Sequence, residues 1–173
     1  MPHRRPLAVP LVIACCLAAA GALDGRAGET GTPDAVQLAD ITNPDHPYKI
    51  APDGTVDWAT YNGYRRYNSI CETCHGFDGT GSSFGPRLVD SLKTMSYEKF
   101  VETVASGKKD VSASQTLVMP ALGTNPNVMC YIDDIYTYLK ARANGALGRG
   151  RPAKHEPKPQ SAVEAENSCM GSG

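Results

Sequence analysis

Residues 71–75 read Cys71-Glu72-Thr73-Cys74-His75, and no other run in the chain constrains its chemistry as strongly. Two thiols three positions apart lie one helical turn from each other, so both can reach the vinyl groups of one porphyrin. The adjacent imidazole can then reach the iron from one face. The run predicts covalent attachment of one haem through Cys71 and Cys74, with His75 as an axial ligand.

Length and composition allow one small domain. The chain has 173 residues, of which 41% are apolar and only three are Phe. It is too short for a catalytic domain beside a separate haem module, and its apolar content indicates a thin core. A buried porphyrin would supply apolar surface of its own, so we expect the haem to be part of the fold.

Residues 1–22 are typical of a secretory signal peptide. Arg4 and Arg5 give a positive start, an apolar run follows from Leu7 to Ala20, and residues 18–20 are small, as a cleavage site requires. The mature protein is therefore expected in the periplasm. The apolar run is too short for a spanning helix, so no transmembrane span is predicted. A second interpretation is a lipoprotein cleavage box that leaves Cys15 lipidated.

The net charge gives no sign of nucleic-acid binding. Without residues 1–22, which hold two Arg and no acidic residue, 15 Lys and Arg face 18 Asp and Glu, a formal charge of −3. Haem propionates would make the protein more acidic still. This balance disfavours nucleic acid and anionic lipid as partners and leaves docking to another protein open.

The chain divides into three parts by composition. Residues 23–55 are rich in Pro, Gly and Asp turn signals and predict an irregular N-terminal extension. Residues 56–147 carry apolar periodicity and form the expected domain. Residues 148–173 are rich in Arg, Lys, Pro and Ser and predict an irregular polar tail.

Three helices are expected within the domain. They run from Asp57 to about Ile70, from Ser96 to Ser106 with Gly107 as the stop, and from Pro126 to about Asn144. No stretch alternates like a strand, so the fold class predicted is all-α.

A small helical domain with C-x-x-C-H after its first helix resembles the class I cytochrome c family. Gly63 and Tyr67 stand where that family has a small residue and an aromatic residue at the crossing of its N- and C-terminal helices. Tyr136 or Tyr138 would be the partner of Tyr67. The resemblance implies two helices crossing around one covalently attached haem, with Tyr67 supporting the pocket.

The same resemblance assigns support for the proximal ligand. His75 needs an acceptor for its second ring nitrogen, which would hold the imidazole in place. Gly85-Pro86-Arg87-Leu88 is similar to the segment that plays this part in the family. It implies that the Pro86 carbonyl accepts this hydrogen bond and that Leu88 packs against the porphyrin. A plain turn at Gly-Pro is the alternative.

The sixth iron ligand has several candidates. Met119 is favoured, because a Met followed by Pro before the last helix resembles the distal-ligand loop of the family. Met/His ligation saturates the iron and suits outer-sphere electron transfer rather than O₂ chemistry. The other candidates, which are expected to pack as ordinary side chains or to lie in the flanks, are Met95, Met129, His46 and His155.

Two cysteines remain in the mature chain, Cys130 and Cys169. In an exported protein two leftover thiols favour a disulfide, which would tie the tail back to the domain. Closing a loop of 39 residues would contribute ~4 kcal/mol on the chain-entropy model. Intermolecular pairing and free thiols are the alternatives.

A narrower resemblance covers residues from about 53 to 151. It rests on residues 53–67 together with the single haem site, Met119, and Cys130 with its distant partner. Asp53-Gly54-Thr55-Val56-Asp57-Trp58, followed by Tyr61-Asn62-Gly63-Tyr64-Arg65-Arg66-Tyr67, is similar to the four-cysteine cytochromes of methanol metabolism related to cytochrome c-L. Members of that family accept single electrons from a quinoprotein methanol dehydrogenase, here of the lanthanide-dependent type, and pass them to a smaller cytochrome c or an oxidase. The resemblance implies the same role, with no enzymatic activity, for this chain.

The sequence without the family resemblance is also compatible with other functions. The electron donor could be an ethanol-type quinoprotein dehydrogenase. A haem enzyme or gas sensor would require that Met119 does not bind the iron. A thiol oxidoreductase or zinc module could also use Cys71 and Cys74, but the chain lacks a βαβ pattern and a second pair of ligands.

Overall fold

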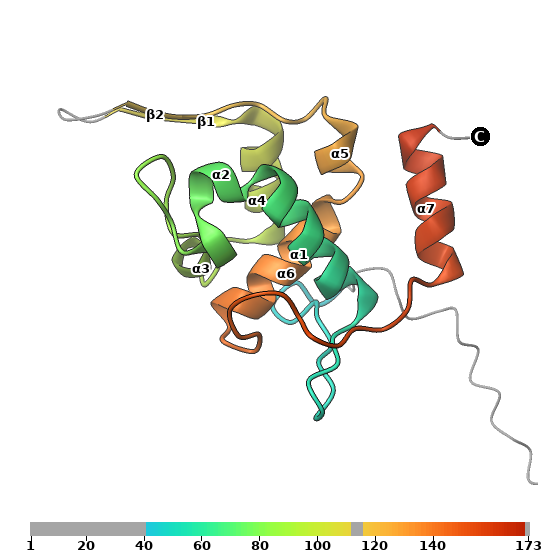
Figure 1. Ribbon diagram of the computed structural model, residues 1–173. Helices are drawn as coiled ribbons and strands as arrows, with labels where there is room; N and C mark the ends of the chain where they lie inside the picture. The colour runs from blue at the N-terminus through green and yellow to red at the C-terminus, as the bar shows by residue number, and fades with distance from the viewer. Residues whose placement is uncertain (1–40, 112–115, 172–173) are drawn as a thin grey trace, which may run out of the picture. The chain divides into compact units, whose positions relative to one another are not determined.

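The computed structural model describes residues 41–111 and 116–171, and Figure 1 shows its helices and strands. In chain order these are α1 (Trp58–Ile70), α2 (Glu72–His75), the 3-10 helix η1 (Phe77–Gly79), α3 (Leu88–Ser91), α4 (Tyr97–Ser106), β1 (Lys108–Val111), β2 (Thr116–Met119), α5 (Pro126–Met129), α6 (Ile132–Ala143) and α7 (Gln160–Met170). The expected signal peptide, with Cys15, and most of the expected extension at 23–55 lie outside the described residues. Within the described ranges no helix is long and apolar enough to cross a membrane.

Helices α1 and α6 pack closely at the centre of the domain. A Cβ at Gly63 would lie 1.8 Å from the carbonyl oxygen of Asp134, so a side chain at this contact would force the helices apart. The ring of Tyr67 lies 5.5 Å from that of Tyr138 between centroids. Tyr138 is therefore the partner of Tyr67, whereas Tyr136 packs against aromatic residues of α4.

The helices expected near 57–70 and 96–106 are confirmed. The Asp57 carboxylate caps α1 by accepting a hydrogen bond of 2.7 Å from the Thr60 amide. The Ser96 hydroxyl caps α4 by accepting one of 3.2 Å from the Lys99 amide. Gly107, with a φ of +74°, ends α4.

The helix expected from 126 to 144 is interrupted. Tyr131 has a φ of −130° and separates α5 from α6. The guanidinium carbon of Arg66 on α1 lies 3.4 Å from the centroid of the Tyr131 ring. This long-range cation–π contact stabilises the break and cannot be seen in the helical periodicity of the segment.

The all-α expectation is wrong for residues 108–111 and 116–119, which form a small antiparallel sheet. Strands β1 and β2 pair with Lys108 opposite Met119 and Val111 opposite Thr116. All four residues of β1 are exposed, so no position on this strand requires an apolar side chain to face a core. Its sequence therefore shows no alternation of apolar and polar residues. The fold is mostly helical with one two-stranded sheet.

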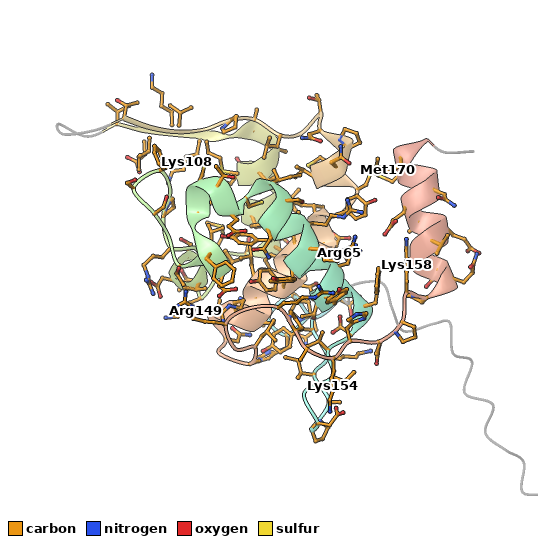
Figure 2. The ribbon with its side chains drawn as sticks, viewed as in Figure 1. Arg65, Lys108, Arg149, Lys154, Lys158 and Met170 are labelled. Atoms are coloured by element: carbon orange, nitrogen blue, oxygen red, sulfur yellow. A yellow bond between two sulfur atoms is a disulfide. The ribbon has the colours of Figure 1, made fainter. Side chains whose placement is uncertain are left out.

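The irregular-tail expectation is wrong for residues 160–170, which form α7. The preceding segment lies along the start of α1, where Val56 donates to Lys154 O and Glu156 donates to Val56 O. Along this segment Lys154 pairs with Asp53, and Lys158 pairs with Glu166 of α7 (Figure 2).

The expected disulfide joins Cys130 and Cys169. It ties α7 to the junction between α5 and α6. Near the start of α7, Ala162 is buried in a small apolar cluster with Val56, Trp58 and Tyr61. The tail is thus attached both by packing and by a covalent bond.

Candidate haem site

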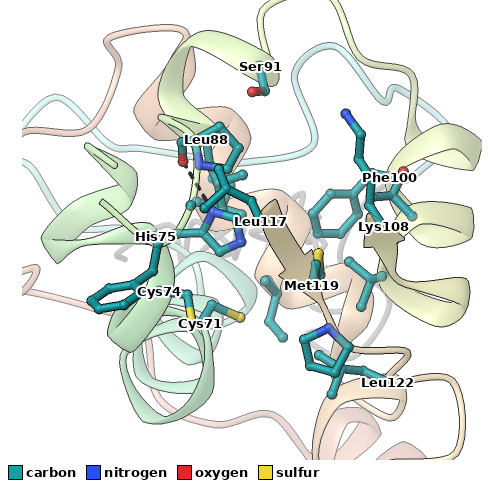
Figure 3. A pocket seen from close by; sticks show the side chains of 18 of the residues that line it. Cys71, Cys74, His75, Leu88, Ser91, Phe100, Lys108, Leu117, Met119 and Leu122 are labelled. Atoms are coloured by element: carbon teal, nitrogen blue, oxygen red, sulfur yellow. Dashed lines mark hydrogen bonds between the residues drawn. The ribbon is translucent and has the colours of Figure 1, made fainter. Parts of the chain in front are cut away.

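A cavity of about 490 Å³ lies between the C-x-x-C-H segment, α3, α4, β2 and α6 (Figure 3). Most of its walls are apolar side chains that also belong to the main core. These lining residues include Leu88, Leu92, Phe100, Val104, Leu117, Leu122, Val128, Ile132, Ile135 and Leu139. Apolar side chains of α4 and α6 therefore face a cavity and do not only pack against each other.

The C-x-x-C-H residues lie together at one side of this cavity. Cys71 ends α1 and begins α2, and the His75 amide donates to the Cys71 carbonyl at 2.9 Å. This single turn brings both thiols and the imidazole to the same wall. Both thiols are free of disulfides.

The orientation of His75 is set by the segment at 85–86. His75 Nδ1 lies 3.1 Å from the carbonyl oxygen of Pro86, and the ring is buried. A Cβ at Gly85 would lie 2.9 Å from the same nitrogen, so only glycine lets this segment pack so closely. With Nδ1 protonated and donating to Pro86, Nε2 is left as the ring atom able to bind a metal.

Met119 lies at the end of β2, and Figure 3 shows it on the other side of the cavity from His75. Of the other candidates, Met95 also lines this cavity. His46 instead packs near Tyr48, and the His155 ring stacks on Tyr61 at 3.6 Å. The structure thus leaves two methionines, not one, at the cavity wall.

Tyr67 supports the site from behind rather than lining it. Its side chain is fully buried, and its hydroxyl donates to the Gly76 carbonyl at 2.5 Å. Burial raises the pKa of this phenol, so the hydroxyl stays a donor. The bond ties α1 to the chain immediately after His75. Leu88, by contrast, lines the cavity itself.

The Cys71 thiol is poorly suited to thiol–disulfide chemistry. Burial and, to a smaller extent, the neighbouring Cys74 raise the pKa of Cys71 to about 11. A reactive cysteine needs a lowered pKa, because the thiolate is the nucleophile. In the described part of the chain, no three His, Cys, Asp or Glu side chains are grouped to hold a metal ion.

Sequence reasoning missed two lining residues, Phe84 in the loop before Pro86 and Val118 in β2. Both line the cavity, yet these residues are 69% and 61% exposed. Phe84 is a single apolar residue in a polar loop, and Val118 lies in an apolar run of three residues that is too short to give a periodic signal. In the sequence they share one feature, which is that each comes just before a predicted site residue. Phe84 stands two positions before Pro86, and Val118 stands one position before Met119.

The chain is similar in sequence and in fold to known cytochromes. A family model described as cytochrome C oxidase, cbb3-type, subunit III matches residues 59–139. The crystal structure of the c-type cytochrome XoxG from Methylobacterium extorquens AM1 has 47% sequence identity and a TM-score of 0.60, covering 70% of this chain and 80% of that chain. Cytochrome c-555 of Methylococcus capsulatus is 42% identical over 106 residues, which are 61% of this chain and 76% of that protein.

This chain belongs to the c-type cytochromes, which are electron carriers rather than enzymes and bind covalently attached haem c. In particular, it is 52% identical to cytochrome c-553I of Paracoccus denitrificans over 158 residues, which are 88% of this chain and 70% of that protein. The residues at the cavity fit this cofactor, because two thiols, an imidazole and a thioether lie around an apolar space.

Proposed function

We propose that this protein is a periplasmic mono-haem cytochrome that takes single electrons from a quinoprotein methanol dehydrogenase and passes them to a smaller cytochrome c or an oxidase. The support is the resemblance of residues 53–67 to methanol-metabolism cytochromes and the similarity to c-553I and XoxG. The donor proposed is the lanthanide-dependent type of dehydrogenase, which contains pyrroloquinoline quinone.

Each residue at the cavity has a proposed task. Cys71 and Cys74 would form the thioether bonds, and His75 and Met119 would be the axial ligands. The bound haem supplies a metal that exchanges one electron at a time. The Pro86 carbonyl fixes the His75 ring, and the apolar walls keep water from the metal.

The observation that carries the proposal is the placement of His75 and Met119 on opposite sides of one apolar cavity. Two strong ligands would leave no open coordination position. Such a site favours electron transfer without bond making, whereas an enzyme or sensor needs a free position.

The donor is tested with the purified holoprotein. Lanthanide-dependent methanol dehydrogenase and methanol are expected to reduce it, with the rate saturating in cytochrome concentration. An ethanol-type quinoprotein dehydrogenase serves as the comparison. Faster reduction by the ethanol enzyme would replace the proposed donor, and no reduction by either would refute a quinoprotein donor.

The ligand assignment is tested by Met119→Ala, with Met95→Ala as the matched control. Met119→Ala should keep the haem attached but open its sixth position, giving rapid CO binding to the reduced protein and a lower reduction potential. Met95→Ala should leave the sulfur-to-iron charge-transfer band of the oxidised protein in place. If Met95→Ala abolishes this band and Met119→Ala does not, the assignment of the ligand is wrong.

A further inference from the structure

A second cavity, of about 550 Å³, lies beside α3 and the C-terminal end of α6 and carries an excess of positive charge. The whole chain is balanced, with 17 Lys and Arg against 18 Asp and Glu. Among the residues that line this cavity, four are cationic and one is acidic. The cationic residues are Arg87, Lys93, Arg142 and Arg149, and the acidic residue is Asp90.

The carboxylate of Asp90 is already shared between two of these cations. It lies 2.7 Å from Arg87 Nε and 3.0 Å from Lys93 Nζ. These hydrogen bonds, that of Arg87 first, lower the pKa of Asp90, which therefore stays ionised at neutral pH. Arg149 pairs with a second carboxylate, that of Asp78, whereas among the described residues no carboxylate pairs with Arg142.

One N–H group of Arg142 has no hydrogen-bond partner among the described residues. Its Nε is buried and has no hydrogen-bond partner, whereas its Nη1 donates to the Leu147 carbonyl at 2.6 Å. Burial of an unpaired N–H group costs about 1–3 kcal/mol, more when the group is charged. This Nε has almost no accessible surface, so only the Nη groups of Arg142 can serve a ligand in the cavity.

Arg149 is held at the rim by a buried carboxylate. Its Nε lies 3.3 Å from Asp78 Oδ2, and Asp78 in turn accepts hydrogen bonds from Tyr138 and from the Gly150 amide. The Arg149 side chain is nevertheless 66% exposed, and it makes no other hydrogen bond within the described ranges. Most of its N–H donors thus remain open to a ligand in solution.

Backbone donors satisfy part of the carbonyl groups at the end of α6. The Gly145 amide donates to the Arg142 carbonyl at 3.1 Å. The amides of residues 146 and 147 both donate to the Ala141 carbonyl. These donors, together with the charge of Arg142, reduce the negative pole of the helix at this cavity.

We propose that this second cavity binds a small oxyanion of the phosphate class between Arg142, Arg149 and Arg87. Planar guanidinium groups recognise phosphate oxygens through pairs of parallel hydrogen bonds. Helix α3 separates this site from the haem site, because Leu88 lines one cavity and Arg87 and Val89 line the other. The inference does not depend on which dehydrogenase is the electron donor.

The site is tested by isothermal titration of the holoprotein with inorganic phosphate at constant ionic strength. We expect saturable binding of one anion per protein. Arg149→Gln should weaken binding at least about tenfold, which corresponds to about 1.4 kcal/mol. Lys154→Gln, which removes an equally exposed cation beside Asp53, should leave binding unchanged (Figure 2).

A second variant distinguishes the effect of the positive charge at residue 142 from the effect of the planar arrangement of its N–H donors. Arg142→Lys keeps the positive charge but removes the planar set of donors, and it should also weaken phosphate binding. The visible spectrum and circular dichroism of each variant report whether it is folded. Absence of saturable heat, or equal binding by Arg149→Gln and Lys154→Gln, would overturn the proposal.

A parallel experiment distinguishes a free anion from a lipid headgroup. The holoprotein is sedimented with vesicles of phosphatidylglycerol and, as a control, of phosphatidylcholine. Cosedimentation with the anionic vesicles that Arg149→Gln abolishes would support the site with a headgroup as its ligand. Phosphate binding without cosedimentation would support it with a free anion.

Discussion

Gly63 determines how closely α1 approaches α6, and its replacement tests that contact. Gly63→Ala would place a methyl group 1.8 Å from the Asp134 carbonyl oxygen. Alanine gains about 1 kcal/mol in helix propensity, but the forced separation of two packed helices outweighs this gain. We expect a net loss of about 2 kcal/mol or more in the free energy of unfolding, measured by urea denaturation.

The matched control is Gly148→Ala, because no atom lies within 4 Å of the added Cβ at that position. Its effect should stay within about 0.5 kcal/mol. Equal stability of the two variants would show that the contact between α1 and α6 tolerates a side chain at residue 63.

Asp134 makes stability depend on pH. Burial raises its pKa to about 7 from a model-compound value of 3.8, although a hydrogen bond of 2.7 Å from Asn62 acts in the opposite direction. Between these pH values the folded protein holds a proton that the unfolded chain releases. The free energy of unfolding should therefore fall as pH rises from about 4 to 7, by about 3 kcal/mol from this group.

Asp134→Asn should remove this part of the pH dependence. Asn62 Oδ1 is buried without a hydrogen-bond partner, so an amide donor at 134 is compatible with its surroundings. Urea denaturation at pH 4.5 and 7.5 measures the difference, and exposed Asp110→Asn is the control. If Asp134→Asn and the unmodified protein lose the same stability between the two pH values, another group is responsible.

At the scale of elements, α7 depends on the disulfide between Cys130 and Cys169. Beyond the burial of Ala162, the residues of α7 are exposed or only partly buried. Reduction opens a loop of 39 residues and should lower the free energy of unfolding by about 2–4 kcal/mol. Denaturation with and without a dithiol reductant measures this, and the haem should stay attached because thiols do not cleave thioethers.

A double Cys130→Ser, Cys169→Ser variant is the control for that measurement. It should have the lower stability of the reduced protein and should not respond to the reductant. Unchanged stability of the original protein, once mass spectrometry shows both thiols reduced, would contradict a stabilising role for this bond.

At the scale of the whole molecule, folding and haem binding are one event. The haem cavity is lined by residues of the main core, so without the cofactor these apolar side chains lose packing partners. The whole stability of a small domain is only about 5–15 kcal/mol, so this loss is a large fraction of it. A variant that cannot attach haem, with Cys71, Cys74 and His75 replaced by Ala, should lack fixed tertiary packing.

Near-ultraviolet circular dichroism and thermal unfolding measure this loss. The haem-free chain should show a weak aromatic signal and no cooperative transition. A cooperative transition at the temperature of the holoprotein would show that the core is stable without the cofactor.

Local signals predicted α1 and α4 well, because the residues that begin and end a helix stand directly at its ends. In α4 these are the N-cap Ser96 and the C-cap Gly107. The break before α6 was not predicted, since it depends on Arg66 from a different helix lying over Tyr131. The hairpin and α7 were missed for a related reason. Exposed strands have no apolar alternation, and α7 is held by a bond to Cys130, far away in sequence.

The sequence by itself determined the covalent chemistry, because Cys71, Cys74 and His75 are close along the chain and one helical turn is enough to bring them together. The family resemblance already implied Met119 and the Pro86 carbonyl, and the structure has both of them at the cavity. Tertiary structure alone revealed that Met95 shares this cavity and that Arg87 and Arg149 lie around a second one. Cavities form between segments that are remote in sequence, so only the packed chain reveals which side chains share one.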